Sequence, residues 1–482
     1  MSTSPRPSPK GPASFAGLAM AMLPFADAAS ADLPLGRLLR LALFQFSVGM
    51  ATVLLNGTLN RVMIVELGAP AWIVATLIAV PLLVAPFRAL IGHRSDTHKS
   101  ALGWRRVPYI WFGTMLQFGG LAIMPFALLL FDEADTFNLG IVAAAASFLM
   151  TGAGFHVTQT AGLALATDLA PEDKRPRAVA LLYVMLLIGM MFSAFVIGGL
   201  LIEFSPTRLV QVIQGAAVLT MVLNVTALWK QEARNVEATA PSRQTPDFRE
   251  LWNAFVKDGR NARLLTAIGI GAAGFAMQDA LLEPYGGEVL GLSVGATTSL
   301  TGAWALGALA GFMLSGRMLS RAGDPLRIAA LGLVIGVMAF IVILFAPAFA
   351  SPAMLFAGSA LIGLGLGLFS VGTLIEAMNL AANATAGLAL GAWGAVQASC
   401  AGLGIALGGA IRDTVSAIVM SGDQTAAVAT RATGYTTVYI LEILLLLAGL
   451  AAIGPLVGSG RRSATNSGES NGQPFGLREF PT

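Results

Sequence analysis

The chain has 482 residues, of which 56% are hydrophobic and only 11% charged, with a formal net charge of +3. Soluble proteins carry about 25% charged residues, so this chain cannot cover a water-facing surface, and most of it is predicted to lie in lipid. The net charge reflects few acidic residues rather than a basic patch, which argues against nucleic-acid binding, and a single cysteine, Cys400, excludes an intrachain disulfide framework.

Twelve apolar segments follow one another along the chain, each long enough for a membrane core that needs about 20 residues. The first six are predicted near residues 40–66, 72–92, 108–131, 138–167, 177–203 and 208–229. The second six are predicted near residues 263–287, 293–314, 327–349, 353–378, 385–411 and 433–457. The sequence therefore predicts an all-α polytopic membrane protein with an N-terminal segment (1–37), a first six-helix bundle (38–229), a polar linker (230–262), a second six-helix bundle (263–458) and a tail (459–482).

Lys and Arg are concentrated on one side of this topology. If the N-terminus is cytoplasmic, most of the 29 Lys and Arg residues fall in the two terminal segments, the linker and the loops after the second, fourth and eighth helices. Because basic loops stay in the cytoplasm, both termini are predicted to be cytoplasmic. The first 30 residues also loosely resemble a cleavable signal peptide, an alternative weakened by Pro24, which interrupts the apolar run.

The two halves carry related segments. Gly152-Ala153-Gly154 in the fourth helix matches Gly363-Leu364-Gly365 in the tenth at an offset of 211 residues. The basic loop after the second helix is echoed by the loop after the eighth. Two related six-helix halves with matching loops are the layout of the major facilitator superfamily, in which the halves enclose a central site.

The loop after the second helix resembles a gating motif of that superfamily, formed here by Gly92, Asp96, Arg105 and Arg106. The glycine lets two helices approach closely, and Asp96 is expected to hold an arginine or a helix N-terminus across the interface between the halves. The alternative is an ordinary basic loop on the cytoplasmic side. Neither interpretation identifies a substrate.

Polar side chains in the seventh helix are the main functional candidates. Gln278 and Asp279 lie one turn before Glu283, and the two acids share one helix face. Charged groups in a membrane span are functional hypotheses by default, and this pair can carry a proton, ligate a cation or hydrogen-bond a ligand. Alternatively, Glu283 lies at the helix end, in contact with water. For Glu442, in the twelfth helix, a structural role is favoured.

The first helix carries a stripe of neutral polar residues, Gln45, Thr52, Asn56 and Asn60. Their spacing places them on one face, which is expected to point to the interior rather than to lipid. Such side chains serve either as hydrogen-bonding partners of a ligand or as contacts between helices.

His156 is the one histidine inside a predicted span, with Gln159 and Thr160 one turn further along the fourth helix. A histidine there can relay protons, bind a metal axially or make ordinary hydrogen bonds. The chain has no phosphate-binding loop, no His-Glu-x-x-His motif and no cysteine cluster, so no enzymatic activity is predicted.

Several longer strings resemble the PucC/LhaA family of bacteriochlorophyll-delivery proteins. They cover residues 59–68, 85–106, 154–170, 277–279 and 282–287, and include Gly154-Phe155-His156 and Glu283-Pro284-Tyr285. The likeness extends over roughly residues 35–457. The string from Leu23 to Ser30 is similar to the LhaA branch, which serves the core antenna.

The resemblance implies an assembly factor of a bacterial photosynthetic inner membrane, which delivers bacteriochlorophyll a to antenna polypeptides. The reaction centre and pigment-synthesis enzymes are further expected partners. Within this interpretation His156 is an axial ligand of the bacteriochlorophyll magnesium or contacts the pigment. The other pigment-binding candidates are Gln159, Asn56, Gln278, Asp279 and Glu283.

Two other functions remain open at this point. A proton-coupled exporter of small solutes is compatible with the gating motif and with the acid pair of the seventh helix. A scaffold for antenna helices without a pigment site is the second alternative.

Overall fold

The computed structural model of the chain describes residues 29–30, 33–83, 91, 95, 104–131, 135–171, 174–232, 257, 259–321, 323–380, 386–420 and 427–457. The secondary structure of these residues is helical throughout. The first half contains α2 (Leu35–Leu41), α3 (Leu43–Thr52), η2 (Val53–Leu59), η3 (Val62–Glu66), α4 (Ala71–Leu83), α6 (Val107–Phe131), α7 (Phe137–Leu169), α8 (Arg175–Leu200) and α9 (Pro206–Leu228). The second half contains α11 (Gly259–Ala276), η7 (Met277–Ala280), α12 (Leu282–Leu290), α13 (Val294–Ser320), α14 (Pro325–Phe345), α15 (Pro352–Leu380), α16 (Ala386–Met420), α17 (Ala427–Ile453) and η9 (Gly454–Leu456).

These helices coincide with the predicted spans. Ten described helices are long and apolar enough to cross a membrane, with mean hydropathy between 1.2 and 3.0. The bent pair of α11–η7 and α12 corresponds to the seventh predicted span, and the shorter apolar helix α4 to the second. The predicted polytopic all-α fold is therefore confirmed, and the remaining part of the second predicted span, from residue 84 to 92, lies largely outside the described residues.

Local sequence signals explain where several helices begin. The Ser205 side chain accepts the N–H of Arg208 at 3.1 Å, and the Asp324 side chain accepts the N–H of Leu326 at 2.9 Å. A proline follows each capping residue at the first helical position, where its missing N–H costs nothing. The polar connections between the apolar segments thus set the start of α9 and α14.

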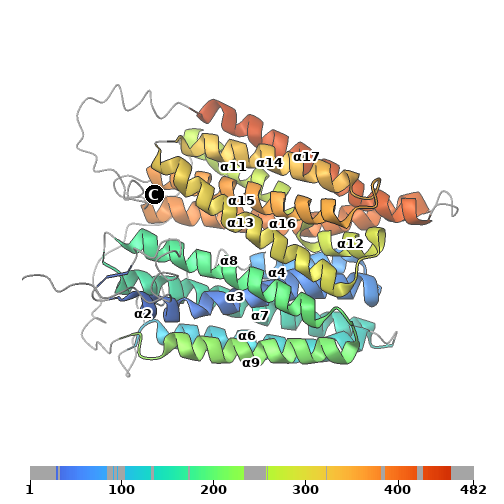
Figure 1. Ribbon diagram of the computed structural model, residues 1–482, viewed down its shortest axis with the longest axis horizontal. Helices are drawn as coiled ribbons and strands as arrows, with labels where there is room; N and C mark the ends of the chain where they lie inside the picture. The colour runs from blue at the N-terminus through green and yellow to red at the C-terminus, as the bar shows by residue number, and fades with distance from the viewer. Residues whose placement is uncertain are drawn as a thin grey trace, which may run out of the picture.

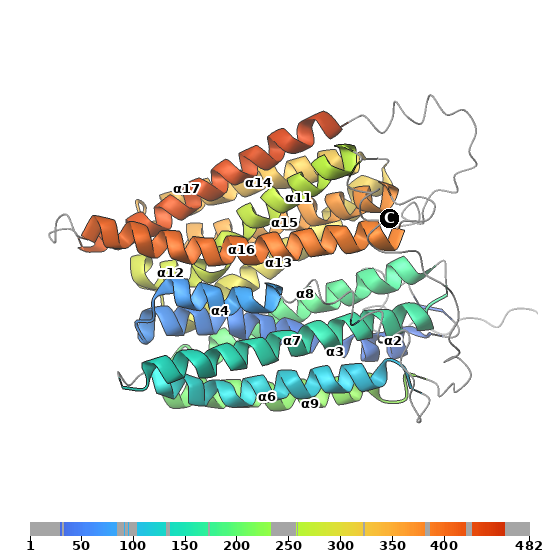
Figure 2. The same ribbon diagram turned by 180° about the vertical axis from the view of Figure 1, so that it is seen from behind.

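The helices form two bundles that lie side by side, with α2–α9 in one and α11–α17 in the other (Figure 1). The same arrangement is seen from behind in Figure 2, where α4 lies beside α16. We call the end of the molecule where α6 begins and α9 ends the basic end, and the end where η3 and α12 finish the opposite end. The predicted orientation, with the basic end in the cytoplasm, stays a prediction.

Close approach of the halves at the opposite end requires glycine. A Cβ at Gly295, near the start of α13, would lie 2.4 Å from the carbonyl oxygen of Gly198 near the end of α8. A Cβ at Gly409 of α16 would lie 2.5 Å from the Cβ of Ala75 in α4. Real Cβ atoms do not approach so closely, so these small residues allow the backbones to pack against each other.

The first span departs from a regular α-helix. Two π-helical segments, η2 and η3, follow α3 and continue to Glu66. π-helical turns are rare and are often found at functional sites. They lie at the opposite end, in the part of the first span that faces the second half through Thr58 and Asn60.

Candidate functional site

The seventh predicted span is bent by 44° between α11 and α12. Pro284, in the first turn of α12, has no N–H to donate to the carbonyl of Ala280, which explains why the helix is interrupted there. The N–H of Gln278, in the interrupting turn η7, is donated to a carboxyl oxygen of Glu442 on α17 at 2.7 Å. This bond places Glu442 at the break, and the structural role expected of it stays a prediction.

Glu283 joins the two halves of the molecule. One carboxyl oxygen accepts the side-chain N–H of Asn60 from the first half at 2.9 Å, and the other accepts the hydroxyl of Thr301 from α13 at 2.8 Å. The side-chain N–H of Asn60 also lies 3.4 Å from the carbonyl oxygen of Asp279. Glu283 is only 5% exposed, so its place is an internal contact between the halves and not the water interface considered above.

The neighbouring candidates of the seventh span are also brought together. The side-chain amide of Gln278, which is 2% exposed, donates to the carboxyl group of the half-buried Asp279. Among the described residues, no hydrogen bond joins Asn56 to these acids, and Asn56 is half-buried on η2. Asn60, one turn further along the polar stripe and between the two π-helical segments, makes the contact instead.

Further hydrogen bonds hold the halves together at the opposite end. They join Thr58 to Thr298 at 3.2 Å, Arg61 to the carbonyl of Leu292 at 3.4 Å, and the N–H of Trp72 to Asp413 at 2.8 Å. The last of these places a carboxylate at the N-terminus of α4, where the helix dipole favours negative charge. In this structure the opposite end is therefore closed by polar contacts between the halves.

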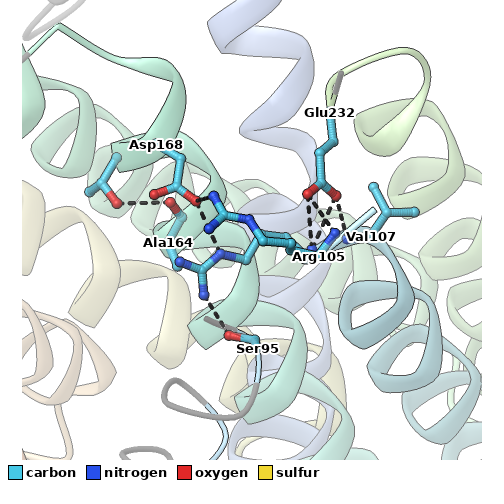
Figure 3. A network of polar contacts seen from close by, with 8 residues as sticks. Ser95, Arg105, Val107, Ala164, Asp168 and Glu232 are labelled. Carbon is cyan, nitrogen blue, oxygen red and sulfur yellow. Dashed lines mark hydrogen bonds and ion pairs between the residues drawn. The ribbon is translucent and has the colours of Figure 1, made fainter. Parts of the chain in front are cut away.

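The arginines of the predicted gating motif bind within the first half (Figure 3). The guanidinium group of Arg106 lies 3.1 Å from Asp168 at the end of α7 and 2.6 Å from the hydroxyl of Ser95. Arg105 lies 3.6 Å from the same carboxylate. Since these partners all belong to the first half, the contacts fix the basic end of α6 against α7 rather than bridging the halves. Gly92 and Asp96, to which the expected bridge was assigned, lie outside the described residues.

Glu232, just after α9, completes this network (Figure 3). Its carboxyl oxygens accept the backbone N–H groups of Arg105, Arg106 and Val107 at 2.7 to 3.2 Å. They belong to Val107, the first residue of α6, and to the two residues before it, so Glu232 caps the start of α6 from another part of the chain. Neither Glu232 nor Asp168 was a candidate from the sequence. Asp168 could have been found from its position, because it is an acid at the end of the fourth span, on the same predicted side of the membrane as Arg105 and Arg106.

His156 lies inside the first half. It is 6% exposed, and its ring centroid is 4.5 Å from that of Phe155. One turn further along α7, Gln159 donates to the side chain of Gln45 on α3 at 3.1 Å. The polar stripe of the first span therefore points to the interior at Gln45 as predicted, and there it makes a contact between helices.

The sequence candidates fall into two regions of the membrane interior. Gln45, the partner of Gln159, and Asn60, the partner of Glu283, are fifteen residues apart on the first span. At a helical rise of 1.5 Å per residue this is a separation of roughly 20 Å along the helix axis. The His156–Gln159 pair and the acids of the seventh span are thus separate sites, at different depths, and the pigment-binding roles assigned to both stay predictions.

Comparison with known proteins identifies the family. The profile of the PUCC protein family matches residues 58–461, which cover most of the first half and all of the described second half and include His156, Gln159, Asn60 and the acids of the seventh span. The chain belongs to the PucC family. It is 57% identical to the protein PucC of Rhodovulum sulfidophilum, over 82% of this chain and 88% of that protein. It is also 53% identical, over 96% of this chain and 98% of the relative, to an uncharacterized protein in the puhA-bchM intergenic region of Rhodobacter capsulatus.

Solved structures confirm the fold of this PucC-family chain. A bacterial homologue of the human lysosomal transporter Spinster, in an inward-facing and occupied conformation, superimposes with a TM-score of 0.64 at 13% sequence identity. The match covers 86% of this chain and 95% of that protein. At this identity the likeness establishes the fold alone, which is that of major-facilitator-type transporters. The chain is therefore a multi-pass membrane protein with that architecture.

Proposed function

We propose that this chain is an assembly factor for a bacterial light-harvesting antenna, with the core antenna as its first expected client. The observation that carries the proposal is the PucC-family match from residue 58 to residue 461. A deletion strain tests it directly through its near-infrared absorption spectrum. Loss of an antenna band, restored by the intact gene, is expected, and a spectrum identical to that of the parent strain would contradict the proposal.

The cargo in this proposal is bacteriochlorophyll a, with His156 as the axial ligand of its magnesium. A neutral imidazole is a suitable donor for an open axial position of a metal. The burial of His156 inside the first half, beside the ring of Phe155, supports the assignment because it gives the imidazole low-dielectric surroundings. No enzymatic step is part of this function, in which the protein holds the pigment and hands it over.

Purification from a pigmented host tests the cargo. The wild-type protein is expected to carry bacteriochlorophyll in its absorption spectrum, and His156→Ala to lose most of it. Gln117→Met is a matched control, because Gln117 is a fully buried polar residue of the same half that contacts the backbone of Ser47. Pigment retained by His156→Ala at the wild-type ratio, or lost equally in both variants, would remove the assignment of this residue.

The expected partners are antenna polypeptides, together with the reaction centre or pigment-synthesis enzymes. The expected location is the intracytoplasmic photosynthetic membrane, with both termini and the basic end in the cytoplasm. The two arginines of the basic end, the buried Arg106 and the partly exposed Arg105, are consistent with the charge bias of cytoplasmic loops. Reporter fusions after Ile202 and after the C-terminus should place these two points on opposite sides of the membrane.

A further inference from the structure

The break between α11 and α12 contains a third acid in addition to Asp279 and Glu283. Glu442 of α17 is fully buried, and only one of its carboxyl oxygens is used, as the acceptor of the Gln278 N–H at 2.7 Å. Its second oxygen, Oε2, is buried without a hydrogen-bond partner among the described residues. Buried polar atoms are almost always hydrogen-bonded, so we expect this oxygen to bind a proton, an ion or another ligand.

A second buried polar atom without a partner lies beside it. Tyr439 is three residues before Glu442 on α17, on the same helix face, and the two side chains interact electrostatically. The Tyr439 hydroxyl is fully buried and has no hydrogen-bond partner in the described part of the chain. Its ring packs edge-on against Tyr285 at 5.2 Å and stacks on Phe340 at 6.0 Å, so aromatic rings shield the Tyr439 side of Glu442.

The cations near the break are neutralised by other acids. Arg61 pairs with Glu66 at 2.8 Å, and Arg412 pairs with Glu288 at 2.5 Å and with Asp413 at 2.8 Å. Among the described residues, the other titratable side chains packed around the break are Tyr285 and Tyr435. Three carboxyl groups, those of Asp279, Glu283 and Glu442, thus share one region with no basic partner in the part of the chain that the structure describes.

Three ionised carboxylates in this position would repel one another, and the buried Glu283 and Glu442 would also lack the solvation of water. Asp279 interacts unfavourably with Glu283 and with Glu442 when all are charged. A buried charge persists only where it is paired or neutralised. Among the residues that the structure describes, no group of three or more His, Cys, Asp or Glu side chains is placed to hold a metal ion. The neutralising ligand that fits is therefore a proton.

We propose that the break between α11 and α12 is a proton-binding site, in which Glu442 and Asp279 hold a proton taken from water, and that the site controls the contact between the halves through Glu283. Deprotonation adds a negative charge next to Glu283 and forces the carboxylates apart. The hydrogen bond from Asn60 to Glu283, which closes the opposite end, is then strained. Protonation removes the repulsion and favours the closed arrangement seen here. This inference does not depend on pigment binding.

Infrared spectroscopy of the purified full-length protein tests the bound proton. The C=O stretch of a protonated carboxylic acid should be present near neutral pH, should shift in deuterium oxide, and should weaken in Glu442→Gln or in Asp279→Asn. Glu442→Gln keeps an oxygen to accept the Gln278 N–H, so the fold is retained. Absence of the band in the wild type at every pH, or a band of wild-type intensity in both variants, would overturn the proposal.

Distances between spin labels test the coupling. Labels at Ile202 and Phe349, which are 67% and 69% exposed on different halves at the opposite end, should separate as the pH rises from about 5 to about 9. Glu442→Gln should keep the short distance throughout. Glu376→Gln is the matched control, because Glu376 is a buried acid of the same half that is paired with Arg260 at 2.8 Å, and it should respond like the wild type. A wild-type distance that is independent of pH, or a pH response retained in Glu442→Gln, would contradict the coupling.

Discussion

Replacing Asn60 with leucine should release the contact that closes the opposite end of the molecule. The substitution removes the donor at 2.9 Å from Glu283 and leaves one oxygen of a side chain that is 5% exposed without its partner. The other oxygen keeps the hydroxyl of Thr301 at 2.8 Å, so only part of the interaction is lost. Hydrogen bonds to charged groups contribute about 1.5–3 kcal/mol, and we therefore expect about 2 kcal/mol in favour of the open arrangement.

A free-energy change of about 2 kcal/mol corresponds to a shift of roughly 30-fold in the ratio of open to closed molecules. Double electron–electron resonance between labels at Ile202 and Phe349, in a Cys400→Ala background, measures that ratio as the relative weight of two distance populations. The control is Thr58→Val, which removes a neutral contact of 3.2 Å to Thr298 and should shift the ratio only about fivefold. Equal shifts in the two variants, or no shift with Asn60→Leu, would refute the reasoning that Glu283 is the principal contact between the halves.

Three further variants test the packing that supports the site. Glu232→Ala leaves three N–H groups at the start of α6 without their acceptor and should lower the free energy of unfolding by about 2 kcal/mol. This is measured as a lower melting temperature in detergent, and an unchanged melting temperature would mean that water replaces the cap. Gly295→Ala puts a Cβ 2.4 Å from the carbonyl oxygen of Gly198 and should lengthen the distance between the halves, and a wild-type distance distribution would show that the backbones adjust. Asn224→Leu breaks the hydrogen bonds to Ser47 at 2.6 Å and Thr114 at 3.0 Å and should lower the free energy of unfolding by about 1–2 kcal/mol in a thermal melt. Wild-type stability would show that these two bonds make no net contribution.

The candidate acids could be found from the sequence because charge inside an apolar segment is rare. Asp279 and Glu283 stand out in a chain with only 11% charged residues, and the cost of burying them marks them as functional candidates. Their partners could not be found in this way. Asn60 and Thr301 are neutral polar residues on other helices, and nothing in their local sequence indicates which of many such residues reaches Glu283.

Glu442 shows why a structural role and a functional one are hard to separate from sequence alone. Its position in the twelfth helix, which is usually peripheral in this fold, favoured a structural role. The structure places it against the break, where one of its carboxyl oxygens accepts the N–H of Gln278 in the turn η7. The unused oxygen of Glu442 appears only when the partners of every buried atom are known.

The amino-acid sequence by itself determined the membrane environment, the approximate bounds of the spans and the family, because each depends on local composition or on residue order. An apolar stretch of about 20 residues spans lipid as a helix, since a helix pairs its backbone groups within the segment itself. Only the tertiary structure decided which helices meet. The closure of the opposite end, the cap of α6 by Glu232 and the grouping of three acids at one break depend on contacts between residues more than a hundred positions apart. Such contacts are selected by the packing of the whole bundle. Small residues such as Gly198 and Gly295 allow that packing, but the sequence around them does not indicate which helix packs there.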